Sequence, residues 1–289
     1  MEKRRDFGGW DQFKQAFTLA AEAGKAPNIA VTSHLDIAPW AQAGYIVPIE
    51  DYIDIDSWPT NNIYPNLISI ARLGNVQWGI PQDSESRPMF FWRDTMRKSM
   101  TDFYQFFVDC VNAGVTRRNH IGTEWNQWYN EVSHGKAAIW HGGTWHYARY
   151  IKEGNEDFFG TIQFSLIPKG NKDEGRPNTI THPLVYLLAK QGDEDTLEIA
   201  AKLIKIASEP RVNALHAIKS AHLGISPLEQ DIDFYANDRW AREATARLLP
   251  YANAQPNNQK YGQFSQIMWK GLEAAWGGIK SPEDAVAVG

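Results

Sequence analysis

The chain has little cysteine, no long apolar run and no excess of positive charge. Its single cysteine, Cys110, excludes an intramolecular disulfide and any metal site built from several cysteines. Nothing in the sequence approaches 18 consecutive apolar residues, which excludes a membrane-spanning helix. The formal net charge of -5 gives no general attraction to phosphate backbones, so we expect no nucleic-acid partner. The 289 residues, 43% of them hydrophobic, are typical of a globular protein with one large domain or two ordinary ones.

Aromatic residues, in contrast, are abundant. The chain contains 12 Trp, 11 Tyr and 13 Phe. Part of this excess is expected in the core, because aromatic side chains bury large areas. Trp also provides a flat platform for stacking against ligands, and a sugar ring with one apolar C–H face suits such a platform. The composition therefore favours two interpretations, core packing and a carbohydrate site.

Strands alternate with helices along the first two thirds of the chain, and helices dominate the last third. Apolar spacing predicts helices over residues 11–24 and 102–113, and Cys110 falls on the buried stripe of the second one. This order predicts α/β layers with mostly parallel sheets, whose ligands bind beyond the carboxyl ends of the strands. Strands are predicted over 28–32, 88–92, 136–141, 162–166 and 184–189. The loops expected to carry function are 33–40, 82–87 and 141–145.

The turn His141-Gly-Gly-Thr144 resembles the oxyanion-hole segment of lipases and esterases. Such an enzyme also needs a G-x-S-x-G nucleophile elbow, and none occurs in this chain. The alternative is a strand-to-helix turn that exposes backbone N–H groups to solvent or ligand. His141 and His146 are not spaced to share a helical face, and no metal motif or phosphate-binding loop is found. We therefore expect neither a metal nor a cofactor.

Asp83 and Glu85 are the carboxylates best placed for chemistry. If their segment is extended, they point the same way and lie about 6.5 to 7 Å apart at the backbone, a spacing compatible with a glycosidase pair. Arg87 lies on the same face, and a neighbouring cation holds carboxylates ionised, which disfavours a general acid. We interpret the pair as hydrogen-bond acceptors for hydroxyls, with catalysis as the alternative.

Three tryptophans lie beside the expected loops. Trp40 follows the first loop, Trp92 the second and Trp145 the third, so aromatic and polar side chains are predicted to converge on one crevice. Core packing is the alternative for each of them. The tryptophans at helical spacings are expected to pack inside the protein: Trp10, Trp125, Trp128, Trp240, Trp269 and Trp276.

Several segments together resemble one protein family. Residues 24–44 look like its "G-x-A-P-D-(I/V)" strand and the helix that follows, and residues 79–94 are similar to its "G-(I/V)-P … Y-N-K-D" hinge segment. Residues 135–145 correspond to "G-x-A-A-M-x-x-x-G-x-W", while residues 225–227 and 280–285 match a late crossing turn and an "S-P-E-E-A" terminus. Each motif alone is weak, but their order spans nearly the whole chain. The sequence is therefore identified as a member of the extracellular sugar-binding proteins of bacterial ABC transporters.

This resemblance implies an α/β fold, the two-lobe periplasmic-binding-protein fold of type II, with discontinuous lobes that close on a ligand bound between them. By similarity, lobe 1 holds residues 1–83 and 178–235, and lobe 2 holds residues 88–177 and 236–289. Hinge crossings are expected near residues 84–87, 177–180 and 226–240.

The resemblance also implies a function. The protein is expected to be a monomer, periplasmic or extracellular and associated with the cell surface, that binds a mono- or oligosaccharide and delivers it to the ABC permease membrane subunits without catalysis. A secreted glycoside-acting enzyme using Asp83 and Glu85 is one alternative, and a non-sugar solute receptor of the same fold is another. Glu85 carries over best, because it precedes Asp94 at the family's spacing. The full expected ligand-binding set is His34, Asp36, Trp40, Asp83, Glu85, Arg87, His141, Gly143, Thr144, Trp145 and Tyr251.

The sequence departs from the family pattern in two places. Family members open with a signal peptide and a strand–helix–strand unit before the segment that matches residues 10–24, and neither is present here. The join near residues 98–101 is abrupt, because a substantial stretch of the second lobe normally precedes the helix at 102–113. Either the chain is truncated or residues are left out of the sequence. We favour the second interpretation, because loss of a core strand from each lobe would expose apolar surface.

Overall fold

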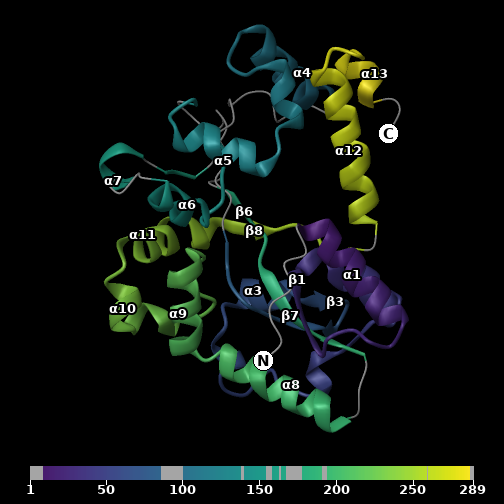
Figure 1. The fold of residues 1–289 in the computed structure, drawn as a ribbon, viewed down its shortest axis with the longest axis vertical. Coiled ribbons are helices and arrows are strands. Elements are labelled where there is room, and N and C mark those ends of the chain that lie inside the picture. Colours follow the sequence, from purple (N-terminus) through teal and green to yellow (C-terminus); the bar gives the residue numbers. More distant parts are fainter. Residues whose placement is uncertain are drawn as a thin grey trace. The chain divides into compact units, whose positions relative to one another are not determined.

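In a computed structural model, the chain forms two compact units. Each unit is assembled from separate stretches of the sequence. Unit 1 contains residues 1–85, 182–242 and 254–259, and unit 2 contains residues 86–181, 243–253 and 260–289. The residues that the structure describes are 9–85, 100–137, 140–153, 158–162, 164–166, 178–190, 194–258 and 260–286. Figure 1 shows the elements of both units.

Unit 1 is built around one small sheet. Its strands are β1 (Ile29–Ser33), β2 (Ile46–Val47), β5 (Gly79–Pro81) and β7 (Leu184–Ala189), with a separate pair β3 (Arg72–Leu73) and β4 (Val76–Gln77). Its helices are α1 (Trp10–Glu22), α2 (Ile37–Gln42), α3 (Pro65–Ile70), α8 (Glu194–Ala207), α9 (Pro210–Ser220) and α10 (Asp233–Ala236), and α11 (Arg239–Leu248) begins in it. Short 3-10 turns are η1 (His34–Asp36), η2 (Ile49–Asp51), η3 (Thr60–Asn62) and η6 (Pro227–Asp231).

Strand β7 is the centre of this sheet. It pairs antiparallel with β1 on one edge and with β2 and β5 on the other. The expectation of mostly parallel sheets is therefore wrong for this sheet. Its physical reason is that β7 enters the sheet only after the chain has passed through unit 2, so that it is not joined to β1, β2 or β5 by the short right-handed helical crossover that makes neighbours parallel.

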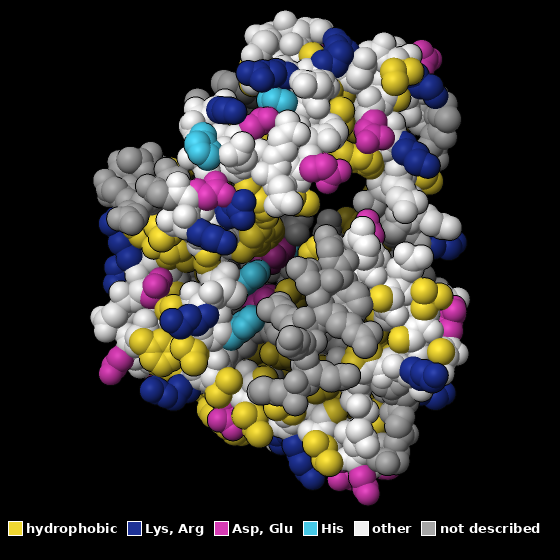
Figure 2. Space-filling model, in the orientation of Figure 1, with side chains coloured by type: hydrophobic (Ala, Val, Ile, Leu, Met, Phe, Trp, Pro, Cys, Tyr) yellow, Lys and Arg dark blue, Asp and Glu magenta, His cyan; other side chains and the backbone are white. Residues whose placement is uncertain are grey.

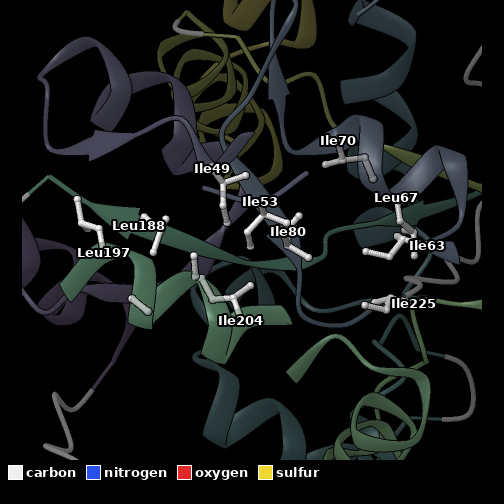
Figure 3. Close-up of a cluster of buried hydrophobic side chains, with 12 residues drawn as sticks. Ile49, Ile53, Ile63, Leu67, Ile70, Ile80, Leu188, Leu197, Ile204 and Ile225 are labelled. Atoms are coloured by element: carbon white, nitrogen blue, oxygen red, sulfur yellow. The ribbon is translucent and has the colours of Figure 1, made fainter. Parts of the chain in front are cut away.

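The side chains of β7 alternate between two hydrophobic layers, as expected for a strand covered on both faces. Val185, Leu187 and Ala189 pack with residues of α1 and α2. Leu188 points the other way and packs with α8, whose Leu197, Ala200, Ala201 and Ile204 share one buried face as their spacing predicts. Figure 3 shows this second layer around Leu188 and Ile80. These two layers hold in place the sheet whose strand ends carry the candidate site residues.

Unit 2 is mainly helical in the part that the structure describes. Its helices are α4 (Met100–Asn112), α5 (Trp125–Ser133), α6 (His146–Lys152), α7 (Phe158–Thr161), α12 (Tyr261–Trp276) and α13 (Pro282–Val286). The turns η5 (Arg118–Gly122) and η7 (Leu249–Tyr251) and the strand pair β6 (Thr179–Thr181) and β8 (Ala252–Ala254) complete it. One core cluster joins Tyr104 of α4 to Leu272 and Ala275 of α12 and Ala285 of α13.

Predicted elements meet different outcomes in unit 2. The helix predicted over 102–113 is confirmed as α4. The strands predicted over 136–141 and 162–166 are wrong at their described residues, which are 136–137, 140–141, 162 and 164–166, because the backbone there is irregular. The strand predicted over 88–92 lies outside the described residues. Among the helices that the structure describes, none is both long enough and apolar enough to cross a membrane.

Candidate functional site

One candidate site lies in unit 1, where three chain segments meet at one end of the sheet. Ser33 at the carboxyl end of β1 is in register with Leu184, and Pro81 at the carboxyl end of β5 is in register with Val185. Because β7 runs antiparallel, its amino-terminal end lies at the edge where β1 and β5 end. The loops that begin at residues 33 and 82 therefore lie at the same end of the sheet. His182 lies there too, because it precedes the first residue of β7 by two positions.

Backbone and side-chain hydrogen bonds hold the segment that carries the two predicted carboxylates. Asp83 is fully buried, and its Oδ1 accepts from the backbone N–H of Leu184 at 3.1 Å. Ser84 exchanges two backbone hydrogen bonds with Leu223, at 2.9 and 2.7 Å. Asn213 of α9 donates to the carbonyl of Gln82 at 2.6 Å. Asp83 and Glu85 thus extend from backbone that is fixed on both sides.

Three histidines face these carboxylates. His216 Nε2 lies 3.7 Å from Asp83 Oδ2, His182 Nδ1 lies 3.4 Å from Glu85 Oε1, and His222 Nε2 lies 4.0 Å from Glu85 Oε2. We name Asp83, Glu85, His182, His216 and His222 the acid–imidazole cluster. Glu85 is only 5% exposed, while all three imidazole side chains are partly exposed. Figure 2 shows histidine and acidic side chains gathered near α9, the helix that carries His216.

His182 connects the cluster to the end of β1. Its Nε2 is hydrogen-bonded to Ser33 Oγ at 2.7 Å, and Ser33 Oγ also accepts from the backbone N–H of Leu35 at 3.1 Å. His34 lies edge-on to the His182 ring, with ring centroids 5.2 Å apart. Burial lowers the pKa of His34 to about 4, helped by the charge of His182, so this imidazole is neutral at ordinary pH. Its Nε2 donates to the carbonyl of Gln255 at 3.1 Å.

Asp36, a predicted hydroxyl acceptor, is engaged within the protein. Its carboxylate accepts from Thr32 Oγ1 at 2.5 Å and pairs with Lys14 Nζ at 2.8 Å. Trp40 packs in the core, stacked on Phe17 with ring centroids 4.0 Å apart, and is 5% exposed. This placement fits the packing alternative for Trp40, which we leave out of the proposed site. Arg87 lies outside the described residues.

A second candidate site, described by itself, is an aromatic group in unit 2. Trp145 follows Gly142 and Gly143, and a Cβ atom at Gly143 would collide with the Trp145 ring, so this close approach requires glycine. Trp145 Nε1 donates to the hydroxyl of Tyr129 on α5 at 2.8 Å. Trp125 of the same helix lies 6.3 Å from Trp145 and 5.9 Å from Tyr129, between ring centroids, and is 50% exposed. We name Trp125, Tyr129 and Trp145 the aromatic group.

The remaining predicted residues of unit 2 have varied surroundings. The carbonyl of His141 accepts from Trp128 Nε1 at 3.3 Å, and Gly143 and Thr144 are buried. Tyr251, at the end of η7, is 40% exposed. The structure places His141, Gly143 and Thr144 on the turn that leads into α6, next to Trp145.

Sequence reasoning missed five residues of these two groups: His182, His216, His222, Trp125 and Tyr129. His182, His216 and His222 come to Asp83 and Glu85 through contacts between distant segments, and no motif or periodicity marks them. Trp125 was assigned to packing because of its helical spacing, yet half of its surface is exposed. Amphipathic spacing identifies a buried face but does not show which aromatic ring at its border stays open to solvent.

The described residues contain no group of three or more His, Cys, Asp or Glu side chains arranged to hold a metal ion. The carboxylates and imidazoles of the acid–imidazole cluster offer hydrogen-bond acceptors and donors. The aromatic group offers flat apolar faces with polar edges. Both kinds of surface suit a ligand with many hydroxyls and apolar C–H faces.

Comparison with known proteins gives one family and many similar structures. The family model described as bacterial extracellular solute-binding protein matches residues 6–214. An ABC transporter solute-binding protein of Thermotoga lettingae, bound with alpha-D-tagatose, is 16% identical with a TM-score of 0.78, covering 97% of this chain and 88% of that one. The GacH receptor of Streptomyces glaucescens, solved unliganded and with acarbose, is 15% identical with a TM-score of 0.79, covering 96% and 86%.

A third structure, maltose-bound MalE3 of T. maritima, is 14% identical with a TM-score of 0.79 and covers 96% of this chain and 86% of that one. A comparison with curated proteins finds no match. At these identities the structural likeness shows the fold. The expected α/β fold of the type II periplasmic-binding-protein class is confirmed.

Proposed function

Because the chain belongs to the bacterial extracellular solute-binding protein family, we propose that it is the substrate-binding component of an ABC sugar importer. It captures a mono- or oligosaccharide outside the cytoplasm, in the periplasm or at the outer cell surface, and delivers it to the permease subunits as a monomer. Structures with the same fold were solved with tagatose, acarbose and maltose. These ligands support a sugar as the cargo here.

The acid–imidazole cluster is the observation that carries this proposal. It sets two carboxylates and three imidazoles at one end of the unit 1 sheet. A sugar hydroxyl can donate a hydrogen bond to a carboxylate, and it can donate to or accept from an imidazole. A hydrogen bond to a charged acceptor contributes about 1.5–3 kcal/mol, so a few such contacts account for micromolar affinity. Lys14 is paired with Asp36.

The aromatic group of unit 2 supports the same ligand class. Trp125 offers an exposed ring. The Trp145 ring lies against Gly143, which has no side chain to collide with it, and its Nε1 donates to the hydroxyl of Tyr129. A positioned indole stacks on the C–H face of a pyranose, with about 1 kcal/mol beyond the area that it buries. Tyr251, His141 and the turn at Gly143 and Thr144 remain proposed contacts from this unit.

We assign no catalysis to the chain. Members of the family are binding proteins, and in this chain both carboxylates are buried and each faces an imidazole. This arrangement supports acceptance of hydroxyl hydrogens more than donation of a proton to a glycosidic oxygen, which a glycosidase requires. Incubation with each oligosaccharide followed by product analysis separates the receptor from a glycoside-acting enzyme.

The proposal is tested first by thermal shift against maltose, mannobiose, mannotriose and D-tagatose, and then by calorimetry. A ligand at 100 times its Kd stabilises the folded state by about 2.7 kcal/mol, a shift that is readily measured. Trp145→Ala is expected to weaken binding of the best sugar about tenfold. Trp269→Ala is the control, because Trp269 is a tryptophan of the same unit that is 50% exposed and hydrogen-bonded to Glu273 of its own helix. Absence of a shift with all four sugars and further oligosaccharides contradicts the proposal.

A further inference from the structure

A buried carboxyl group supports a backbone turn in unit 1, residues 223–226, which we name the support turn. Glu229 of η6 is fully buried, and its Oε1 accepts from the backbone N–H groups of Ile225 and Ser226, both at 3.0 Å. Its Oε2 is shielded from solvent and has no hydrogen-bond partner among the described residues. One carboxyl oxygen thus holds two backbone donors of the support turn, and the other lies in an apolar place.

Two connections join the support turn to residues 82–85, which we name the site segment because it carries both carboxylates of the acid–imidazole cluster. Leu223 exchanges two backbone hydrogen bonds with Ser84, at 2.9 and 2.7 Å. The Oδ1 of Asn213 accepts from the backbone N–H of Ile225 at 3.4 Å, and its Nδ2 donates to the first carbonyl of the site segment at 2.6 Å. The position of the site segment therefore depends on the support turn.

Ionisation of Glu229 disturbs this arrangement. Burial of a carboxylate away from water is unfavourable unless a cation or enough donors compensate for it. The two N–H groups of the support turn favour the ionised form, but burial outweighs them and raises the pKa of Glu229 from 4.5 to about 8. The ionised carboxylate is therefore more stable in water, and its movement toward solvent withdraws Oε1 from Ile225 and Ser226. The support turn then loses the acceptor of two backbone donors.

We propose that Glu229 is a proton-dependent positioning residue for the unit 1 site, which holds the site segment in place when it is protonated and weakens sugar binding when it ionises. This inference rests on the proposed function and names a regulation of the same site. Glu229 itself does not contact the sugar. It acts through the support turn, which carries its effect to the backbone beside the acid–imidazole cluster.

No charged group next to Glu229 shifts its pKa in the part of the chain that the structure describes. Burial raises the pKa of Tyr64, so the hydroxyl of Tyr64 stays protonated between pH 7 and 9. The titratable groups beside the support turn, among the described residues, are Tyr64 before α3, Tyr235 of α10, Asp231 of η6, His222 before the turn, and Asp83 and Glu85 of the site segment. A variant of Glu229 alone separates its effect from theirs.

The test is calorimetry of wild type and Glu229→Gln with the tightest-binding sugar of the panel at pH 7, 8 and 9. At one pH unit above its pKa of about 8, about a tenth of Glu229 is protonated, so the Kd of wild type is expected to rise about tenfold from pH 7 to pH 9. By linkage, sugar binding at pH 8 takes up protons, which buffers of different ionisation enthalpy reveal. Glu229→Gln keeps the acceptor for the support turn and does not ionise, so its Kd is expected to match wild type at pH 7 and to stay constant.

Glu209→Gln is the matched control. Glu209 is an exposed carboxylate of the same unit, so this variant is expected to keep the wild-type pH profile of the Kd. Circular dichroism at each pH verifies that the proteins compared are folded. If Glu229→Gln does not fold, carbon-13 NMR titration of the carboxyl groups of wild type replaces it, and bound sugar is expected to raise the pKa of Glu229.

The outcomes separate this inference from the proposed function. A wild-type Kd that is constant from pH 7 to pH 9, or an equal rise of the Kd in Glu229→Gln, overturns the inference and leaves the sugar receptor standing. A pKa of Glu229 that bound sugar does not change in the NMR titration also overturns it. Failure of every sugar to bind at pH 7 contradicts the proposed function, and the inference falls with it.

Discussion

Glu229 gives a quantitative prediction about stability and pH. The side chain is fully buried at the start of η6, where its Oε1 accepts from the backbone N–H groups of Ile225 and Ser226, both at 3.0 Å. Gly224 lies so close that a Cβ atom there would collide with the carboxyl group. Burial raises the pKa of Glu229 from 4.5 to about 8, against the opposing effect of the two backbone hydrogen bonds. The folded protein therefore keeps this proton at neutral pH.

The sign and size of the effect follow from this difference in pKa. Between pH 4.5 and 8 the unfolded chain loses the proton and the folded chain retains it, so the free energy of unfolding falls as pH rises. The contribution is fully present below pH 4.5 and is lost as pH rises through about 8. At about 1.4 kcal/mol per pKa unit, the loss over the whole window is on the order of 5 kcal/mol. This size is large beside the total stability of an ordinary domain.

Glu229→Gln isolates this contribution, because the amide oxygen still accepts from Ile225 and Ser226 but the group does not ionise. Urea unfolding of both proteins at pH 5 and pH 8 is the assay. The stability of the variant relative to wild type is expected to increase by several kcal/mol from pH 5 to pH 8. Glu209→Gln, at an exposed carboxylate of the same unit, should show no such change. A constant difference between Glu229→Gln and wild type at the two pH values refutes the reasoning.

Two further predictions concern packing. Gly143→Ala is expected to displace the Trp145 ring and weaken binding of the best panel sugar about as much as Trp145→Ala, whereas Gly262→Ala, at a helical glycine with open space around it, leaves the Kd unchanged in calorimetry. Leu188→Ala is expected to lower the free energy of unfolding by about 2–5 kcal/mol, because it opens a cavity between β7 and α8, while Leu203→Ala on the exposed side of α8 costs under about 1 kcal/mol in the same urea titration.

Local patterns predicted several elements of the fold. The spacing of Phe103, Phe106 and Phe107 identified the helix observed as α4, and the continuous apolar run at 184–189 identified the strand observed as β7. Strand direction was not predictable in this way. The neighbours of β7 depend on a chain path that leaves unit 1 and returns, and that path is a long-range property.

The candidate site shows the same division. Asp83 and Glu85 could be found because a single segment carries both, next to a turn at the end of a strand. The histidines that face them lie about 100 to 140 positions further along the chain and have no local signature. The predicted roles of two tryptophans were reversed for a similar reason. Trp40 fills the core next to Phe17, and Trp125 stays half exposed, because tertiary packing decides which aromatic rings are covered.

Isothermal titration calorimetry of the wild-type protein at pH 8 with maltose, mannobiose, mannotriose and D-tagatose, each recovered and analysed afterwards, tests the central claim most directly. The account predicts that at least one sugar binds with one-to-one stoichiometry and is recovered chemically unchanged. Recovery of cleaved sugar, or no heat of binding with any of these sugars and no binding of longer oligosaccharides, would contradict it.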